Sequence, residues 1–398
     1  MACSLAYLPP IEVANLKIAQ VTSFFQPEYY RSNEYFISRE MAKLGHEIVL
    51  ICPEKDPAWQ SSSGPIQSQV KSEEYDGFKV QRIPADPIVL NMPMMLTLFG
   101  TLRKQEFDII HSHEYFTFCS FQSAIASRTK NCPLVITQHN DQLPLPLLNR
   151  LGYMLDTITI GKYSVFEAKK IIALSNDIKL HLMDMGVTDE KIELIPNAVD
   201  STFFSLDSEN LLQTKWGMSA PVVLFVGRLV AEKGVGFLIQ AFHEVVKKIP
   251  DAKLVIMGKG PKETELKNLQ RRLQTKNVFF IGRVENRLMP NIYVGCNVLV
   301  APSLREPFGN VVVEAMASGK PVIGSYVGGM KDTIVHGETG YHVPPGNTNM
   351  LRDSLLKLLS DERLSVKLGK NARRRVLENY DSKIVAKRVE KLYIDAVS

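Results

Sequence analysis

Two carboxylates, Glu306 and Glu314, have seven residues between them in the stretch Arg305 to Gly319, which reads REPFGNVVVEAMASG. The run PFGN predicts that a loop changes into a helix, so that Glu306 lies on the loop and Glu314 about a turn and a half into the helix. The unpaired N–H groups of a helix start suit a phosphate, and a carboxylate accepts hydrogen bonds from sugar hydroxyls. The combination favours a nucleotide-sugar ligand, although a solvated helix start with two ordinary acids has the same spacing.

Two cations occupy a glycine-bounded loop from Gly227 to Gly234, which reads GRLVAEKG. Arg228 could bind a diphosphate through its planar guanidinium, and Lys233 through its compact charge. Surface loops often carry such cations without any ligand, so this loop alone is a weaker signal than the two glutamates.

Two histidines follow the ends of neighbouring expected strands. His113 lies just beyond Phe107 to His111, and His139 lies just beyond Leu134 to Thr137. Ligands of open parallel sheets bind beyond the carboxyl ends of the strands, so two histidines arriving there predict a site. A structural role is the alternative for either ring. Their spacing is not that of zinc ligands, and we expect no metal at this place.

The elements that must position these residues are short apolar strands alternating with helical stretches, a pattern typical of α/β domains with parallel sheets. The alternation begins at Lys17 to Thr22 and restarts at Val222 to Val226. Between them, the polar segment Ser205 to Ala220 reads as a linker. We therefore expect an N-terminal domain over residues 1–204 and a second domain over residues 205–381.

Composition narrows the class of partner. Residues 201–398 hold 29 Lys and Arg against 19 Asp and Glu, which suits an anionic ligand such as a nucleotide diphosphate. These cations are not interleaved with aromatic residues, so nucleic acid is not expected.

Five cysteines without C-x-x-C pairing fit a reducing compartment. The start of the chain lacks the basic region of a signal peptide, and we expect a cytoplasmic protein.

One segment raises the question of membrane contact. Ile88 to Leu102 is rich in Met and Leu and is followed by Arg103 and Lys104. We expect a helix of the N-terminal domain there, and a buried core helix explains its apolar residues. Peripheral attachment to the cytoplasmic face of a membrane is the alternative. No stretch of about 18 uninterrupted apolar residues occurs, so a membrane span is not expected.

Six motifs occur in an order that is typical of one family. They are DIIHSH (Asp108 to His113), IPNAVD (Ile195 to Asp200), VGRLVAEKG (Val226 to Gly234), MGKGP (Met257 to Pro261), REPFGNVVVEAMASGKPVIG (Arg305 to Gly324) and GETGYHVPPGN (Gly337 to Asn347). Over nearly its full length the chain resembles the retaining glycosyltransferases of family 4. The resemblance implies the GT-B fold, with two Rossmann-like doubly wound domains facing each other across a cleft. It also implies an acceptor-binding N-terminal domain, a nucleotide-sugar-binding second domain, and a final helix over residues 382–398 that packs back on the first.

The resemblance implies roles for matching positions. The residues expected to be catalytic are Glu306, His113, Arg228 and Lys233. Those expected to bind the donor are Arg228, Lys233, Val284, Glu285, Glu306, Phe308, Gly309, Asn310, Val311 and Glu314. Arg228 and Lys233 match the diphosphate-binding pair. Glu306 matches the acid that faces the donor sugar, Glu314 matches the acid that holds the ribose, and His113 matches a histidine beside the transferred sugar.

Two places depart from the family pattern. The first loop usually carries Gly-Gly, whereas here Tyr29 to Asn33 contains no glycine. Bulky side chains restrict the approach of a ligand to the backbone, so Arg31 or the tyrosines are expected on the acceptor side, with His139 on a neighbouring loop. Asp332 stands where the family often has Glu. Its shorter side chain is less suited to reach the donor sugar.

The implied reaction moves a hexosyl unit from a UDP- or GDP-linked sugar to a hydroxyl of a sugar, lipid-linked or small-molecule acceptor, with retention. Glycan, glycolipid or cell-envelope polysaccharide synthesis is the expected setting. The chain has no D-x-D motif, so no metal or other cofactor is expected.

A nucleotide-sugar 2-epimerase of the same architecture is the alternative enzyme, and it would need no acceptor cleft. A non-catalytic sugar-nucleotide binding protein is the third hypothesis.

Overall fold

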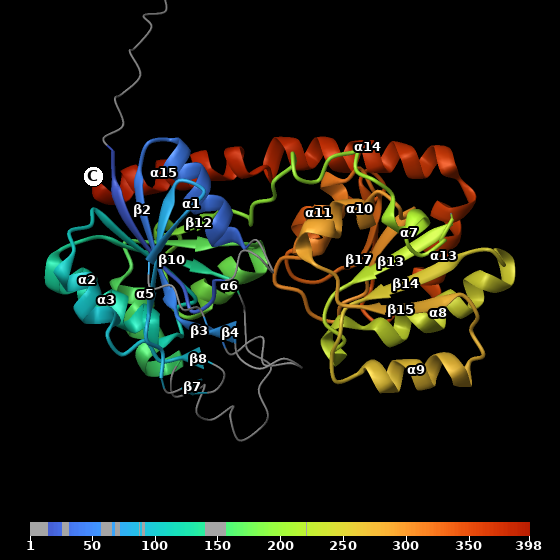
Figure 1. The fold of residues 1–398 in the computed structure, drawn as a ribbon, viewed down its shortest axis with the longest axis horizontal. Helices are drawn as coiled ribbons and strands as arrows, with labels where there is room; N and C mark the ends of the chain where they lie inside the picture. The colour runs from blue at the N-terminus through green and yellow to red at the C-terminus, as the bar shows by residue number, and fades with distance from the viewer. Residues whose placement is uncertain are drawn as a thin grey trace, which may run out of the picture.

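The computed structural model describes residues 15–25, 32–56, 66–67, 72–86, 88–89, 92–139, 157–219 and 221–398. They form two α/β domains that lie side by side, with two long helices running along one edge of both (Figure 1). This is the doubly wound two-domain architecture expected from the alternation of apolar strands and helices.

The N-terminal sheet has eight strands among the described residues, in the order β12-β11-β10-β9-β1-β2-β6-β5, and all neighbours are parallel except β5 and β6. Its strands are β1 (Lys17–Val21), β2 (Glu47–Pro53), β5 (Ser72–Tyr75), β6 (Phe78–Ile83), β9 (Ile109–His113), β10 (Leu134–Gln138), β11 (Lys170–Ala173) and β12 (Ile192–Leu194). Its helices are α1 (Asn33–Lys43), α2 (Leu98–Lys104), α3 (Phe118–Lys130), α5 (Lys162–Glu167) and α6 (Asn176–Asp184). Helices on both faces bury the central strands, which explains their nearly continuous apolar sequences.

The second sheet has six parallel strands among the described residues, in the order β15-β14-β13-β16-β17-β18. They are β13 (Val222–Val226), β14 (Lys253–Met257), β15 (Val278–Gly282), β16 (Val298–Ala301), β17 (Val322–Ser325) and β18 (Gly340–Val343). The helices of this domain are α7 (Leu211–Thr214), α8 (Val235–Lys248), α9 (Glu263–Arg272), α10 (Met289–Tyr293), α11 (Asn310–Ala317), α12 (Met330–Thr333), α13 (Thr348–Ser360) and α14 (Glu362–Asn379), and α15 (Ser382–Val397) follows them but lies on the first domain. The strand order reverses between β13 and β16, which is where ligands bind in sheets of this type.

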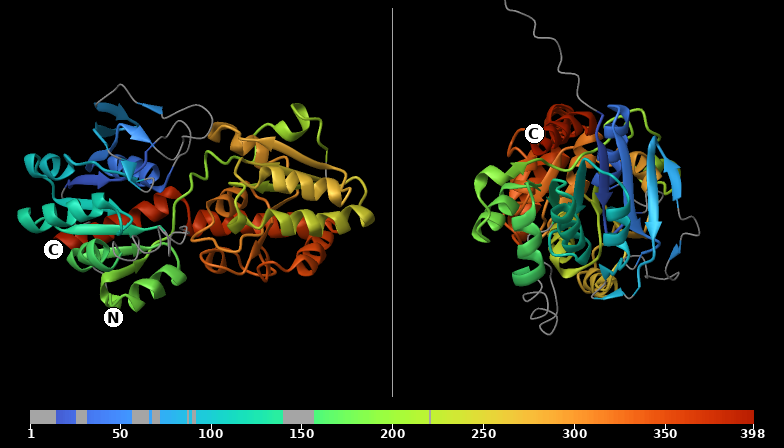
Figure 2. Two further views of the ribbon diagram at one scale, coloured as in Figure 1. Left: turned by 90° about the horizontal axis from the view of Figure 1, so that it is seen from below. Right: turned by 90° about the vertical axis from the view of Figure 1, so that its left-hand side faces the viewer.

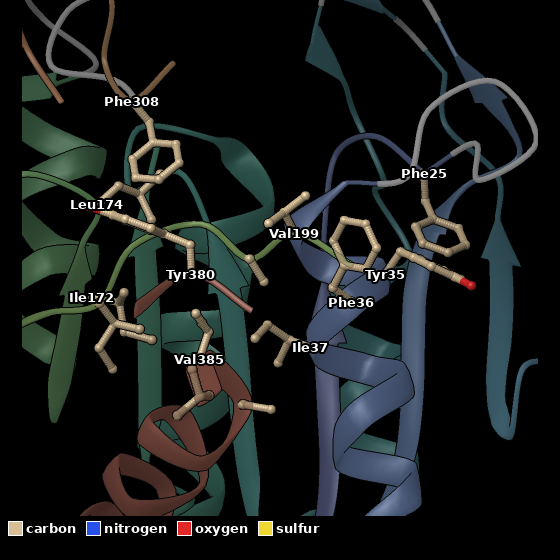
Figure 3. Packing of buried hydrophobic residues seen from close by; sticks show 14 of the residues in the cluster. Phe25, Tyr35, Phe36, Ile37, Ile172, Leu174, Val199, Phe308, Tyr380 and Val385 are labelled. Atoms are coloured by element: carbon tan, nitrogen blue, oxygen red, sulfur yellow. The ribbon is translucent and has the colours of Figure 1, made fainter. Parts of the chain in front are cut away.

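The chain crosses between the domains twice, and the two crossings are hydrogen-bonded to each other. The N–H of Val199 donates to the carbonyl of Tyr380, and the N–H of Ser382 donates to the carbonyl of Val199, both at 2.9 Å. Helix α14 lies along the second domain and α15 continues onto the first (Figures 1 and 2). Apolar side chains of both domains meet around this point, with the rings of Phe308 and Tyr380 at 6.2 Å (Figure 3).

The expectation of one helix over Ile88 to Leu102 is wrong. An antiparallel pair of short strands, β7 (Ile88–Val89) and β8 (Met92–Pro93), precedes α2, which begins only at Leu98. Pro93 lacks the N–H that an interior helical residue must donate, so a helix cannot run through it.

Three of the described apolar residues of this segment face the core. Met95, Leu98 and Leu102 are fully buried, whereas Leu96 is exposed. These positions therefore match the buried-core interpretation rather than a lipid-facing helix. Among the described helices, none combines the length and apolar character that crossing a bilayer requires.

A buried ion pair fixes the first crossing. The guanidinium of Arg39 donates to Asp200 at 2.8 Å, and the two side chains are 12% and 10% exposed. The same guanidinium reaches Ser382 at the start of α15. Although burial alone would raise the pKa of Asp200, hydrogen bonds from Thr202 and Arg39 lower it below its usual range.

Replacing Arg39 with Met is expected to destabilise the protein by about 3 kcal/mol at neutral pH, because it leaves a buried carboxylate without its cation. Asp200 contributes this stability above its unfolded pKa of about 4 and loses it as the pH falls, so the deficit should shrink in acid. Urea unfolding at several pH values measures both effects. Arg128→Met on α3 is the control, because Arg128 is 69% exposed and its contact with Glu167 is 3.7 Å long, so its loss should cost less than about 1 kcal/mol. Equal losses in the two variants would contradict the assignment.

Candidate active site between the domains

The loop after β16 and the start of α11 carry the two glutamates as the spacing predicts. Glu306 lies on the loop, and α11 runs from Asn310 to Ala317 with Glu314 in its second turn. Gly309 precedes the helix with φ +96°, a conformation that favours glycine. Phe308 is 5% exposed and packs against the crossing, which anchors this helix start to the rest of the core.

A close approach of two backbones brings Lys233 to Glu306. Gly234 ends the cation loop at φ +63°, and a Cβ there would lie 2.1 Å from the carbonyl oxygen of Pro302. Only glycine permits this contact. The Nζ of Lys233 lies 2.5 Å from Oε2 of Glu306, which also accepts from the Ser303 hydroxyl at 3.2 Å. The cation and the carboxylate predicted from separate motifs thus form one cluster at the strand-order reversal.

The remaining cation of the loop, Arg228, is exposed. It follows β13 directly, so it lies at the same carboxyl edge of the sheet as the Lys233–Glu306 pair. Its side chain is exposed, whereas that of Lys233 at the same edge is partly buried.

Glu314 is held in a setting that favours its neutral form. The hydroxyl of Tyr293 on α10 donates to Oε2 of Glu314 at 2.7 Å. Burial raises the pKa of Glu314 to about 7, and the hydrogen bond from Tyr293 opposes part of this shift. Glu314 also lines a small pocket between the domains, together with Asn33, Asn197 and Asn310. A ligand hydroxyl that hydrogen-bonds to this carboxyl would favour its ionised form.

A second glycine loop packs on the Glu306 loop and contacts the N-terminal domain. A Cβ on Gly328 would lie 1.9 Å from the carbonyl oxygen of Glu306. Just beyond, Asp332 accepts hydrogen bonds from Asn176 at 2.8 and 2.9 Å, and Lys331 pairs with Asp177 at 2.9 Å. Asp332 therefore joins the two domains at the start of α6, a role that the sequence argument did not predict.

The two predicted histidines lie together at the carboxyl ends of β9 and β10. Nδ1 of His113 and Nε2 of His139 are 2.9 Å apart, and the rings are stacked. Burial lowers the pKa of both, so both are neutral at pH 7. The side chain of His113 is only 2% exposed, whereas that of His139 is 19% exposed. His139 is thus the more exposed ring of the pair.

Sequence reasoning missed two residues that contact this pair and a third that lies behind them. Oε1 of Glu34 lies 3.6 Å from His113 and 3.8 Å from His139. Nε2 of His113 donates to Gln20, which in turn donates to the hydroxyl of Tyr393. The signal for Gln20 was present, because a polar residue inside the apolar strand KIAQV needs a buried partner. Tyr393 gave no signal, because nothing in the sequence links α15 to β1.

Other predicted positions are less central. Val284 is half-buried after β15, and Glu285 is exposed and paired with Arg287 at 2.5 Å. Val311 is half-buried in the first turn of α11. Asn310 accepts a hydrogen bond from Asn197 of the other domain at 2.9 Å. Arg31 and the neighbouring tyrosines lie outside the described residues.

Comparisons with known proteins agree on one kind of enzyme. The family model described as glycosyltransferase family 4 matches residues 35–203, and the one described as glycosyl transferases group 1 matches residues 209–375. A capsular polysaccharide biosynthesis glycosyltransferase of Staphylococcus aureus is 33% identical over 77% of this chain and 84% of its own. The N-acetyl-alpha-D-glucosaminyl L-malate synthase of Bacillus anthracis is 26% identical over 74% of this chain and 76% of its own. These matches give no support to the epimerase hypothesis.

Solved structures share the fold. The Anabaena protein HepE, determined in complex with UDP and glucose, superposes with a TM-score of 0.76 at 20% identity and covers 96% of this chain and 100% of its own. Sucrose-phosphate synthase of Thermosynechococcus elongatus gives 0.75 at 23% identity, with 96% and 99% covered. At this identity the likeness establishes the two-domain architecture alone.

Replacing Glu314 with Gln is expected to stabilise the protein at alkaline pH. The raised pKa means that ionising Glu314 disfavours the folded state, and this penalty grows as the pH rises from 4.5 to about 7. Glutamine has no such penalty, so E314Q should be about 2 kcal/mol more stable than the wild type at pH 8 and nearly equal at pH 4.5. Thermal unfolding at both pH values measures this. The exposed Glu378→Gln is the control, and a destabilised E314Q at pH 8 would contradict the assignment.

Proposed function

The chain belongs to the family 4 glycosyltransferases of the GT-B fold, and we therefore propose that it transfers a hexosyl unit from a UDP- or GDP-linked sugar to an acceptor hydroxyl. The proposed transfer retains the anomeric configuration. It serves the synthesis of a glycan, glycolipid or cell-envelope polysaccharide.

The contact between Lys233 and Glu306 is the observation that best supports this proposal. A cation and a carboxylate meet at 2.5 Å beside the start of α11, at the edge of the sheet where the strand order reverses. A nucleotide-sugar presents a diphosphate next to sugar hydroxyls, which is the complementary pattern of charge and hydrogen-bond donors. A simple anion site would not need Glu306, because a carboxylate repels phosphate.

Donor binding exchanges partners within this cluster. In the free protein Glu306 is paired with Lys233, so neither charge is left uncompensated in a partly buried place. A donor diphosphate competes for Lys233 and draws in the exposed Arg228. Glu306 is then released to accept hydrogen bonds from the donor sugar, while Glu314 accepts from the ribose.

The fixed positive charge also acts in the chemical step. Cleavage of the bond to the sugar develops negative charge on the leaving phosphate, and cations held in place before the reaction stabilise that charge. Lys233, Arg228 and the N–H groups at the start of α11 supply this stabilisation. The proposed mechanism needs no metal for the diphosphate, and the departing phosphate helps to deprotonate the acceptor.

On the acceptor side, the structure favours a division of roles between the histidines. His139 is the more exposed ring and is assigned to contact with the acceptor, whereas His113 positions it from behind through the 2.9 Å hydrogen bond. One relative is named a capsular polysaccharide biosynthesis glycosyltransferase and another an N-acetyl-alpha-D-glucosaminyl L-malate synthase. A hydroxyl on a sugar, lipid-linked or small-molecule acceptor fits this proposal. Membrane contact is not part of the proposal, because Leu98 and Leu102 of α2 are buried.

Lys233→Ala, Arg228→Ala and Glu306→Ala are each expected to reduce kcat/KM for transfer by about 10²–10³-fold, because each removes one pre-organised contact to the donor. Steady-state rates with the preferred nucleotide-sugar, found by a thermal-shift screen, provide the measurement. Lys247→Ala is the matched control, since Lys247 is 55% exposed and pairs with Glu244 on the outer face of α8. Near-normal turnover by Lys233→Ala would refute the diphosphate assignment.

The anomeric configuration of the product is expected to equal that of the donor. NMR of the purified product identifies the anomer, because the new glycosidic bond fixes the configuration of the anomeric carbon. An inverted product would leave the donor site intact but overturn the retaining mechanism.

A further inference from the structure

A small pocket between the domains contains a buried polar atom for which the described residues provide no partner. Amide side chains of both domains line the pocket, together with the carboxyl of Glu314. Asn197 is 6% exposed, and its Oδ1 has no hydrogen-bond partner among the described residues. Burying an amide oxygen without a donor is unfavourable. We propose that Oδ1 of Asn197 binds one ribose hydroxyl of the nucleotide-sugar while Glu314 binds the other, an assignment that rests on the proposed function.

The two ends of the Asn197 amide are used differently. Its Nδ2 donates to Oδ1 of Asn310, the first residue of α11, at 2.9 Å. An amide that donates through Nδ2 keeps Oδ1 as an acceptor, so this is the end left for a ligand. The next residue is held as well, since the N–H of Ala198 donates at 3.0 Å to Oδ1 of Asn33, where α1 begins. The first domain therefore presents the oxygen from a loop that is bonded to a helix start of each domain.

Glu314 has one oxygen engaged before any ligand binds. The hydroxyl of Tyr293 donates to its Oε2 at 2.7 Å, and none of the described residues donates to its Oε1. A ribose carries two neighbouring hydroxyls, and each has a single hydrogen to donate. One acceptor from each domain, Oε1 of Glu314 and Oδ1 of Asn197, matches this pair of donors.

The size and lining of the pocket suit a hydroxyl. Its volume of about 20 Å³ holds roughly one water-sized group. Phe36, Val199 and Phe308, which lie at the domain junction in Figure 3, are among the apolar side chains that line it. The described residues of the lining include no lysine or arginine, so the pocket does not suit a phosphate. A hydroxyl placed there is shielded from bulk water, which strengthens its hydrogen bonds.

A ribose held in this way contacts both domains at once. Asn197 belongs to the first domain and Glu314 to the second, so each hydroxyl ties the donor to a different half of the molecule. A deoxyribose would leave one of the two acceptors without a hydrogen-bond donor, which is unfavourable for a buried polar group. The chain is therefore expected to prefer ribonucleotides over deoxyribonucleotides, and part of this preference comes from outside the second domain.

Calorimetric titration of the full chain with UDP and GDP, and with the 2′-deoxy and 3′-deoxy forms of each, tests the proposal. The wild type is expected to bind each deoxy form of its preferred nucleotide about tenfold more weakly than the parent. Asn197→Ala should lose this discrimination at one hydroxyl and keep it at the other, and Glu314→Leu should show the reverse pattern. Asn197→Asp keeps an oxygen acceptor of the same shape and should retain both. Asn379→Ala, on the exposed end of α14, is the matched control and should discriminate as the wild type does.

Two outcomes would overturn the proposal. One is unchanged discrimination at both hydroxyls in Asn197→Ala, with circular dichroism showing that the variant is folded. The other is loss of both discriminations in Glu314→Leu, which would assign both hydroxyls to the carboxylate and requires no variant of Asn197. Failure of the wild type to bind either UDP or GDP would contradict the proposed function itself. Nucleotide binding with either of the first two outcomes would contradict the Asn197 contact alone.

Discussion

The close contact of backbones at the edge of the second sheet is the constraint on which the candidate site depends. Gly234 lies against the carbonyl of Pro302, and Gly328 lies against the carbonyl of Glu306, at distances that a side chain would forbid. The loops that carry these residues therefore pack more closely than any residue with a Cβ at the glycine positions would allow. Because their backbones touch, Lys233 and Glu306 can meet although 73 positions separate them in the chain. A substitution at either glycine would move this pair apart before it altered any charge.

The N-terminal side of the site depends instead on buried polar contacts that are fully matched. His111, His113 and Gln20 would each be costly to bury alone. They are tolerated because Tyr393 bonds to His111 at 2.6 Å and to Gln20 at 2.9 Å, and His111 also bonds to Thr137 at 2.7 Å. A network of this kind sets ring orientation and protonation together, which a hydrophobic core could not do.

The sequence was informative where chemistry depends on local spacing. The loop and helix that carry Glu306 and Glu314, the alternating strands and the ordered motifs all follow from neighbours in the chain. It failed where a contact is made only by folding. Glu34 meets His113 and His139 only because β9 and β10, which come later in the chain, bring these rings to it. Asp332 meets its partner Asn176 only because the two domains pack together. The helix expected over Ile88 to Leu102 failed for a local reason, because apolar content was weighed above the helix-breaking effect of Pro93.

The hydrogen bond between Gln20 and Tyr393 spans 373 positions in sequence. During synthesis β1 emerges from the ribosome long before α15, so the N-terminal domain cannot complete its own interior until the whole second domain has emerged. Until then Gln20 of β1 lacks its partner Tyr393, and the surface that α15 covers is exposed. Exposed surface of this kind favours binding by chaperones. Folding of this enzyme is consequently not a simple succession of independent domains, and shortening the chain at its C-terminus would damage the half of the molecule that was made first.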